Sequence, residues 1–373
     1  MSEKVSLAIN GKRFVFWTDV TITRAIDSID AVAFRAPFDH EAPDFKENFK
    51  PFGYNPVSVS VNDETLFTGT MMGIDPQVGS DGKTIDVSCY AKCGVLQDCT
   101  APVEALPLEF NNLNLRDIAS KLAGYFKINV VFKDDPGPVF QRVACDPDKK
   151  IYEFLTDLAK QRGFVISSDE NGDLLFWKSA KGTAVAVLQQ GVSPLTKVTP
   201  TFNPQEYYSD LTGLSPVEVG KAPAKKTVKT KKEKKDKNAA PKKTVKRPKP
   251  PKKYQKFTVA DDTEVFRPLS FKIDDIEGAD VETATNAKMA RMLGNMASYE
   301  VEVATWRDSS GKLWQPNTKI KLLAPDAMIY TEYEFEIKSV EFSQNDTSES
   351  ARIVVSLPGS FSGEPPEVFP WEL

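Results

Sequence analysis

The sequence predicts an α+β protein, mainly β, in which two small antiparallel β-barrel domains flank an α/β domain and a disordered basic insertion interrupts the second barrel. Three observations support this: short segments near both ends alternate polar with apolar residues, the middle changes to a helical period, and one stretch is rich in Lys and Pro. The predicted parts are 1–90, the first barrel; 91–180, the α/β domain; 181–220 with 254–358, the second barrel; 221–253, the insertion; and 359–373, an extended tail.

The first ninety residues contain short strands. In 57–61, valines alternate with serines, a period of two that is typical of a strand with one buried face. The pairs Asn-Gly at 10–11, Asn-Asp at 62–63 and Asp-Gly at 81–82 suit tight hairpin turns. The predicted strands are 5–9, 12–17, 20–25, 31–35, 57–61, 64–75 and 84–90.

The middle of the chain changes from a strand period to a helical one. Amphipathic helices are predicted over residues 114–126 and 148–162, because apolar side chains recur there at spacings of three and four. Asn114 and Asp117 suit the capping positions of the first helix. Gly163 suits the left-handed residue that ends the second.

A hairpin over residues 164–178 completes the α/β domain, and from residue 193 the pattern returns to strands. A helix is expected over 280–297. The Pro-rich residues 359–373 are expected to form a tail that needs another surface to lie on. The strands predicted after the helix are 299–306, 319–323, 333–342 and 351–357.

Residues 221–253 carry a concentrated basic charge. Sixteen Lys or Arg stand there against Glu233 and Asp236, a balance of +14, so the rest of the chain sums to -18 for a net charge of -4. The motif Lys-Lys-Thr-Val-Lys occurs at 225–229 and again at 242–246. The segment has many prolines and no aromatic residue, so it lacks the apolar surface that would offset the entropy of ordering. We therefore expect a disordered loop.

Two functions are open for this loop: a solvated spacer, or a binding segment for a polyanion such as DNA, RNA or lipid headgroups. The candidate polyanion-binding residues are Lys225, Lys226, Lys229, Lys231, Lys232, Lys234, Lys235, Lys242, Lys243, Lys246 and Arg247.

The sequence offers little for catalysis. The single histidine, His40, lies in a polar stretch, and a Ser-His-Asp or Cys-His site would have to use it. With 52 Asp and Glu, some pair of carboxylates will always lie at a workable separation, so such a pair is uninformative. Trp17, Trp177, Trp306 and Trp314 fall in or beside predicted strands, which favours packing over a carbohydrate or base platform. We predict no enzyme, no catalytic residue and no cofactor.

The four cysteines do not form a recognisable metal site. Cys89, Cys93, Cys99 and Cys145 lack a paired C-x2-C spacing, and His40 is far away in the chain. We therefore predict no metal, and expect reduced, partly buried thiols of a cytosolic protein.

Neither end of the chain suggests export or membrane insertion. Residues 1–10 lack the unbroken apolar stretch of a secretory signal. No segment approaches the roughly 18 uncharged apolar residues that a membrane-spanning helix needs. We expect a protein made in the cytosol, without stable membrane insertion.

Short stretches in a fixed order carry a family resemblance. They are Thr-Arg-Ala-Ile-Asp at 23–27 with Phe34, Phe-Thr-Gly-Thr-Met-Met-Gly-Ile-Asp-Pro at 67–76, Val-Ser-Cys-Tyr-Ala-Lys-Cys-Gly-Val-Leu-Gln-Asp-Cys at 87–99, 151–163, Asn-Gly-Asp-Leu at 171–174, Gly-Lys-Leu-Trp-Gln-Pro-Asn at 311–317 and Ser-Val-Glu-Phe-Ser at 339–343. In this order the chain resembles the Mu-type baseplate hub (tail hub) proteins of contractile-tailed phages and related injection machines. The resemblance spans nearly the whole chain apart from the insertion and the tail.

This resemblance implies a structural protein of the virion, located in the tail baseplate and assembled in the host cytoplasm. It implies a homotrimer whose six β-barrels form a ring that continues the six-fold tail tube, nucleates tube assembly and attaches the three-fold central spike. The implied partners are the tail tube protein, the central spike protein and other baseplate proteins. The resemblance does not cover the role of the basic insertion, for which DNA or the tape measure is the candidate contact. The acidic balance outside the insertion suits a lumen that DNA passes without sticking.

Two other functions compete with the hub. A nucleic-acid-binding protein would act through residues 221–253, and a wall-degrading enzyme of the tail would cleave peptidoglycan. The first predicts salt-dependent DNA affinity that is lost with the segment, and the second predicts clearing of peptidoglycan by the purified chain.

Overall fold

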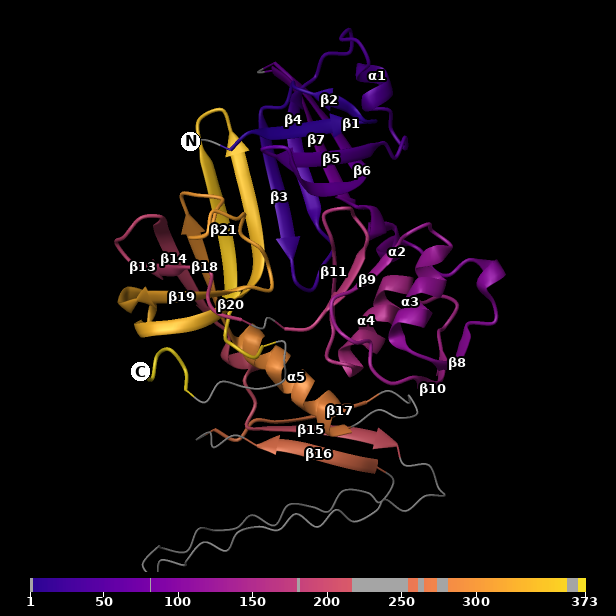
Figure 1. Cartoon of the computed structure of the whole chain (residues 1–373), viewed down its shortest axis with the longest axis vertical. Helices are drawn as coiled ribbons and strands as arrows, with labels where there is room; N and C mark the ends of the chain where they lie inside the picture. Colours follow the sequence, from indigo (N-terminus) through magenta and orange to yellow (C-terminus); the bar gives the residue numbers. More distant parts are fainter. Residues whose placement is uncertain are drawn as a thin grey trace, which may run out of the picture.

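Antiparallel strands dominate the structure, and most of them belong to one large sheet (Figure 1). The structure is a computed structural model. It describes residues 3–80, 82–179, 182–216, 254–260, 265–273, 281–360 and 368–373.

One half of the large sheet comes from the first ninety residues. In β4, Val32, Phe34 and Ala36 are buried and alternate with exposed residues, which confirms the predicted strand period. Asn10 and Gly11 have φ values of 54° and 74°, as a primed hairpin turn requires. The elements are β1 Val5–Ile9, β2 Lys12–Phe14, β3 Asp19–Ala25, β4 Ala31–Pro37, the short helix α1 Phe45–Asn48, β5 Pro56–Val61, β6 Glu64–Gly79 and β7 Gly82–Ala91.

The other half of the sheet comes from the carboxyl-terminal part of the chain. Buried residues alternate along β18 and β19, as they do at the other end of the chain. The elements are β13 Val187–Gln189, β14 Leu195–Phe202, β18 Ala297–Val303, β19 Lys319–Ala324, β20 Ile329–Asn345 and β21 Glu349–Ser356, with short 3₁₀ turns at Pro204–Glu206 and Pro325–Ala327.

The two halves are joined by direct pairing between β3 and β20. These strands run antiparallel from Ala25 opposite Ser339 to Asp19 opposite Asn345. The main path of the sheet is therefore β14-β18-β21-β20-β3-β4-β7-β6-β5-β1-β2, with β19 beside β20 and β13 beside β19. This path is open at both ends, so the described strands confirm a mainly β protein but form no closed barrel. The alternating pattern reports a buried face of each strand, but not which strand lies beside it.

A mixed α/β unit follows the first half of the sheet. Asn114 accepts a hydrogen bond from the backbone N–H of Asp117 over 2.9 Å, and Gly163 has φ 68° beyond the second long helix, which confirms both predicted helix ends. The elements are 3₁₀ turns at Lys92–Gly94 and Val103–Ala105, α2 Val95–Asp98, β8 Glu109–Leu113, α3 Leu115–Gly124, β9 Val130–Phe132, β10 Phe140–Ala144, α4 Ile151–Gln161, β11 Val165–Ser168 and β12 Leu174–Trp177.

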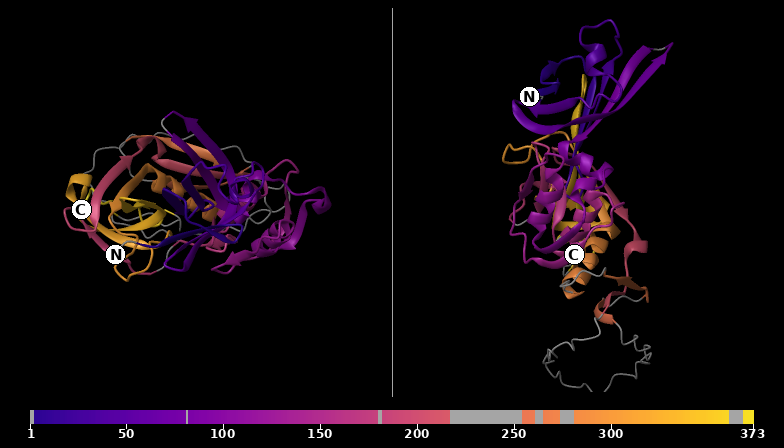
Figure 2. Two further views of the ribbon diagram at one scale, coloured as in Figure 1. Left: turned by 90° about the horizontal axis from the view of Figure 1, so that it is seen from above. Right: turned by 90° about the vertical axis from the view of Figure 1, so that its right-hand side faces the viewer.

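A long helix and a small sheet lie at the opposite end of the molecule from the first β strands (Figure 2). The helix α5, Val281–Met296, confirms the helix predicted over 280–297. It packs on β15 Asp210–Pro216 and β16 Tyr254–Ala260, and β17 Pro268–Lys272 completes this sheet. The molecule is elongated as a result.

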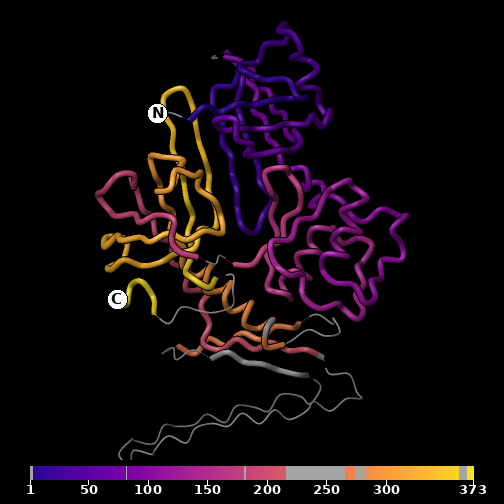
Figure 3. Tube along the Cα trace, viewed as in Figure 1, coloured from indigo at the N-terminus to yellow at the C-terminus, as the bar shows by residue number. Residues whose placement is uncertain are grey.

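The last described residues lie on the chain's own surface, close to the second half of the large sheet (Figure 3). The Trp371 ring meets Phe202 edge to face at 5.4 Å, and the Tyr333 hydroxyl donates a hydrogen bond to the carbonyl of Val368 over 2.8 Å. The surface that the tail was expected to need is thus provided, for residues 368–373, by the same chain.

Candidate assembly surfaces

An aromatic hollow marks the free end of the first β strands. Phe14 and Phe49 lie with ring centroids 5.6 Å apart, and Phe45 and Phe49 lie 4.9 Å apart. These three phenylalanines line a cavity of about 410 Å³, together with Pro37 and residues between β4 and β5. Phe16, on its rim, is 68% exposed. An apolar hollow with an exposed aromatic rim is the kind of surface that proteins use to bind one another.

Further exposed aromatic residues lie between α1 and β5, outside the lining of this cavity. Phe52 is 88% exposed and Tyr54 is 58% exposed. Both have positive φ, 59° and 50°, a backbone conformation that costs free energy for bulky side chains. We call the exposed set Phe16, Phe52 and Tyr54 the aromatic rim. Sequence reasoning did not single it out, because no periodic pattern separates an exposed aromatic in a loop from a buried one in a strand.

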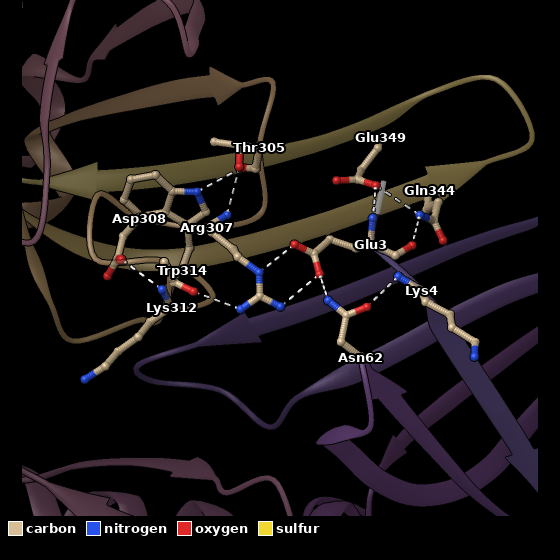
Figure 4. A network of polar contacts seen from close by, with 11 residues as sticks. Glu3, Lys4, Asn62, Thr305, Arg307, Asp308, Lys312, Trp314, Gln344 and Glu349 are labelled. Atoms are coloured by element: carbon tan, nitrogen blue, oxygen red, sulfur yellow. Dashed lines mark hydrogen bonds and ion pairs between the residues drawn. The ribbon is translucent and has the colours of Figure 1, made fainter. Parts of the chain in front are cut away.

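A polar network holds the two halves of the large sheet together beyond the β3·β20 pairing (Figure 4). The Arg307 guanidinium donates two hydrogen bonds to the Glu3 carboxylate, with N–O distances of 2.6 Å and 2.9 Å. Gln344 of β20 donates to the Glu3 carbonyl over 2.8 Å, and the Glu3 N–H donates to Glu349 over the same distance. The hydrogen bond with Glu3 raises the pKa of Arg307. The amino-terminal residues are therefore fixed to the carboxyl-terminal strands.

A buried ion pair lies where the first half of the sheet meets the α/β unit. Arg24 donates to the Asp30 carboxylate over 2.9 Å, and the Asp30 N–H donates to the Ser168 hydroxyl over 2.9 Å. Burial raises the pKa of Asp30 to about 6, although Arg24 acts in the opposite direction. Trp177 donates from its indole to the Ile26 carbonyl in the same turn. This junction holds the α/β unit against the turn between β3 and β4.

The loop between β11 and β12 makes a second contact with the first half of the sheet. Gly172 has φ 78°, and a Cβ placed on it would lie 2.2 Å from the carbonyl oxygen of Thr68. The Gly172 carbonyl accepts a hydrogen bond from the backbone N–H of Cys93 over 2.9 Å. Only glycine permits this close approach of two backbones.

Lys225 to Arg247, the candidate polyanion-binding set, lie outside the described residues. His40 is exposed. Trp306 and Trp314 are buried, and their indoles donate to the carbonyls of Ser350 and Thr305, so packing rather than a ligand platform is confirmed for these two.

The cysteines are separate, and several are buried. Cys89, Cys93 and Cys145 are buried, and Cys99 is partly exposed. Burial raises the pKa of Cys89 to about 12 and that of Cys145 to about 11, so both thiols are protonated at neutral pH. Over the described ranges, no three His, Cys, Asp or Glu side chains gather as a metal site would require. None of the helices described in the structure is long and apolar enough to span a bilayer.

Comparison with known proteins connects this architecture to phage tails. Residues 93–178 match the family described as baseplate hub protein gp44-like, second domain. The baseplate hub protein gp44 of Escherichia phage Mu is 25% identical over 354 residues, which cover 93% of this chain and 85% of that protein.

Solved structures of tail proteins share the fold. The 43 kDa tail protein of prophage MuSo2 from Shewanella oneidensis has a TM-score of 0.75 and 25% identity, covering 96% of this chain and 99% of its own. The tail protein from Neisseria meningitidis MC58 has a TM-score of 0.75 and 16% identity, covering 97% and 99%. The second of these likenesses is one of fold alone.

These matches define the class first: the chain is similar to the baseplate hub proteins of phage-type tails. Within that class it is similar to the Mu-type hubs over most of its length, with the gp44-like second domain at residues 93–178, so the resemblance found in the sequence is confirmed. Its relatives are structural tail components.

Proposed function

We propose that the protein forms a trimeric ring that adapts the six-fold tail tube to the three-fold central spike and nucleates tube assembly. It would assemble in the host cytoplasm and become part of the virion. The observation that carries the proposal is the aromatic rim, since Phe16 and Phe52 are too exposed to serve the monomer's own core. Each side chain that an assembly buries contributes about 1.5–3 kcal/mol.

The division of the chain supports such a ring. The two halves of the large sheet, which fall within the predicted parts 1–90 and 181–220 with 254–358, are joined edge to edge through β3 and β20. A chain with two β regions offers six of them in a trimer, which matches a six-fold tube on one face while three-fold symmetry remains on the other. We retain this division as part of the proposal.

The first test is the mass of the full chain in solution, measured by light scattering alone and with its tube and spike partners. We expect about three subunits per particle, alone or with the spike. The double variant Phe16→Ser, Phe52→Ser should lower ring formation or tube nucleation at least tenfold, since every 1.4 kcal/mol corresponds to tenfold in an equilibrium constant. Its thermal unfolding should stay close to that of the native chain, because both side chains are already exposed.

The matched control is Val103→Ser, which removes another exposed apolar side chain from a different element. This control should assemble normally. A persistent monomer in the presence of both partners would overturn the ring, and normal trimers and tubes from the double variant would overturn the role of the aromatic rim.

A second candidate function, polyanion binding, rests on the composition of residues 221–253. Sixteen cationic residues against two acids favour contact with DNA or with an acidic part of the tape measure. Deletion of 221–253 should then abolish salt-dependent DNA binding by the full chain while trimers still form. If the deletion leaves DNA affinity unchanged, the segment is a spacer.

A further inference from the structure

A cavity between helices α4 and α5 has no role in the proposed hub. Its volume is about 230 Å³, and it lies where these two helices meet the turn between β3 and β4. Since one water occupies about 30 Å³ of liquid, there is room for several waters or for one small polar ligand. Pockets for drug-sized ligands are larger, about 300–1,000 Å³. The polar lining residues are Asp27, Tyr152, Thr156, Lys160, Arg291 and Asn295.

Positive charge predominates around this cavity. Lys160 comes from α4 and Arg291 from α5, and Lys288 lies near enough to affect Lys160. Burial lowers the pKa of Lys160, and Arg291 lowers it further. Asp27 is the acidic residue of the lining.

Lys160 and Arg291, the two cations that line the cavity, lack a close acidic partner of their own among the residues that the structure describes. Asp157 lies 3.9 Å from the Lys160 amine but only 2.7 Å from that of Lys149, so its charge is shared. Within the described part of the chain, the Arg291 guanidinium makes no hydrogen bond or close ion pair, and only the more distant charges of Asp27 and Asp157 act on it. Burial lowers the pKa of Arg291, yet an arginine side chain stays protonated in proteins. A partly buried cation without a close partner is incompletely compensated, and an anion would supply the missing counter-charge.

Neutral donors face the same space. The Thr156 hydroxyl is buried and has no hydrogen-bond partner among the described residues. The Asn295 side chain also lines the cavity, and its amide offers two N–H donors. The walls between these groups are apolar, from Ala159, Phe164 and Ile166. A fork of guanidinium donors, an ammonium group and neutral donors is the set that binds a phosphate or carboxylate group.

We propose that this cavity binds one small oxyanion, a phosphate or carboxylate group, between Arg291 of α5 and Lys160 of α4. The bound anion bridges the α/β unit, through α4, and the helix α5. It therefore stabilises the arrangement of these two parts. None of the residues that line this site belongs to the aromatic rim or to residues 221–253.

The test is thermal unfolding and calorimetric titration of the full chain with inorganic phosphate, against sodium chloride at equal ionic strength. Phosphate that binds only the folded state raises the midpoint of unfolding. We expect such a rise for the native protein. Arg291→Met and Lys160→Met should each weaken phosphate affinity at least tenfold, and Arg291→Lys should keep part of it. Acetate, tested in parallel, distinguishes a carboxylate ligand from a phosphate ligand.

The matched control is Lys197→Met, which removes a cation that pairs with Glu302 on β18, away from the cavity. It should keep the full response. Phosphate bound by residues 221–253 would give the same response in all variants, so an equal response in Arg291→Met, Lys160→Met and the control overturns the proposal. Absence of any response to phosphate and acetate beyond that to chloride also overturns it. If Arg291→Met does not fold, Lys160→Met, at a half-exposed position, decides.

Discussion

At the scale of single residues, Asp30 links stability to pH. Its pKa is raised by burial from 3.8 to about 6, so between those values the folded state binds more protons than the unfolded state. The contribution of Asp30 to the free energy of unfolding should therefore decrease as pH rises from 4 to 6.5. We expect a decrease on the order of 2–3 kcal/mol, measured as the difference between native protein and Asp30→Asn in urea unfolding at each pH.

The control for this measurement is Asp86→Asn, which removes an exposed carboxylate that pairs with Arg35 over 2.6 Å. The difference in the free energy of unfolding between native protein and this control gives the effect of removing an exposed carboxylate. A difference between native protein and Asp30→Asn that stays constant from pH 4 to pH 6.5 would show that Asp30 has the same proton affinity in the folded and unfolded chain.

At the scale of elements, the join between β3 and β20 depends on the Glu3–Arg307 pair. The Glu3 side chain is 9% exposed and that of Arg307 26%, so removal of the guanidinium leaves a carboxylate largely shielded from water. Arg307→Ala should lower the free energy of unfolding by about 2 kcal/mol, measured by urea unfolding. Adding Glu3→Gln should recover part of this loss, because the unpaired charge is then gone.

Arg352→Ala is the matched control on the same sheet. Its side chain is 50% exposed and lies 3.6 Å from Glu300 and 3.9 Å from Glu341, an arrangement worth at most about 1 kcal/mol. Equal losses in the two arginine variants would mean that the bidentate pair does not hold the sheet halves together.

At the scale of the whole molecule, the sequence predicts the helices and strands better than it predicts which strands lie side by side. Strand 5–9, helix 280–297 and the cap at Asn114 were predictable because alternation, helical spacing and capping side chains are local signals. The strand expected over 12–17 ends at Phe14, since Val15 and Phe16 are exposed instead of paired in the sheet.

The join between the sheet halves was not predictable in this way. Ile22 of β3 lies opposite Phe342 of β20, and both are fully buried. Each residue has the alternation of any half-buried strand, and nothing local to either one identifies a partner so distant in sequence. The aromatic rim and the α4–α5 cavity likewise arise from tertiary placement. For the basic residues 221–253, the composition alone carries the prediction.

The pairing of β3 with β20 has a consequence for the order of folding during translation. The ribosome makes β3 early, but the strand that covers its free edge, β20, emerges only when most of the chain has been made. Until then β3 has β4 on one side and an unpaired edge on the other, a template for mispairing between nascent chains. Closure of that edge is a late, non-local step. A chain released prematurely, before Ile329–Asn345, would keep the open edge and be exposed to proteases and chaperones, so truncated chains would be removed before they could assemble with other proteins.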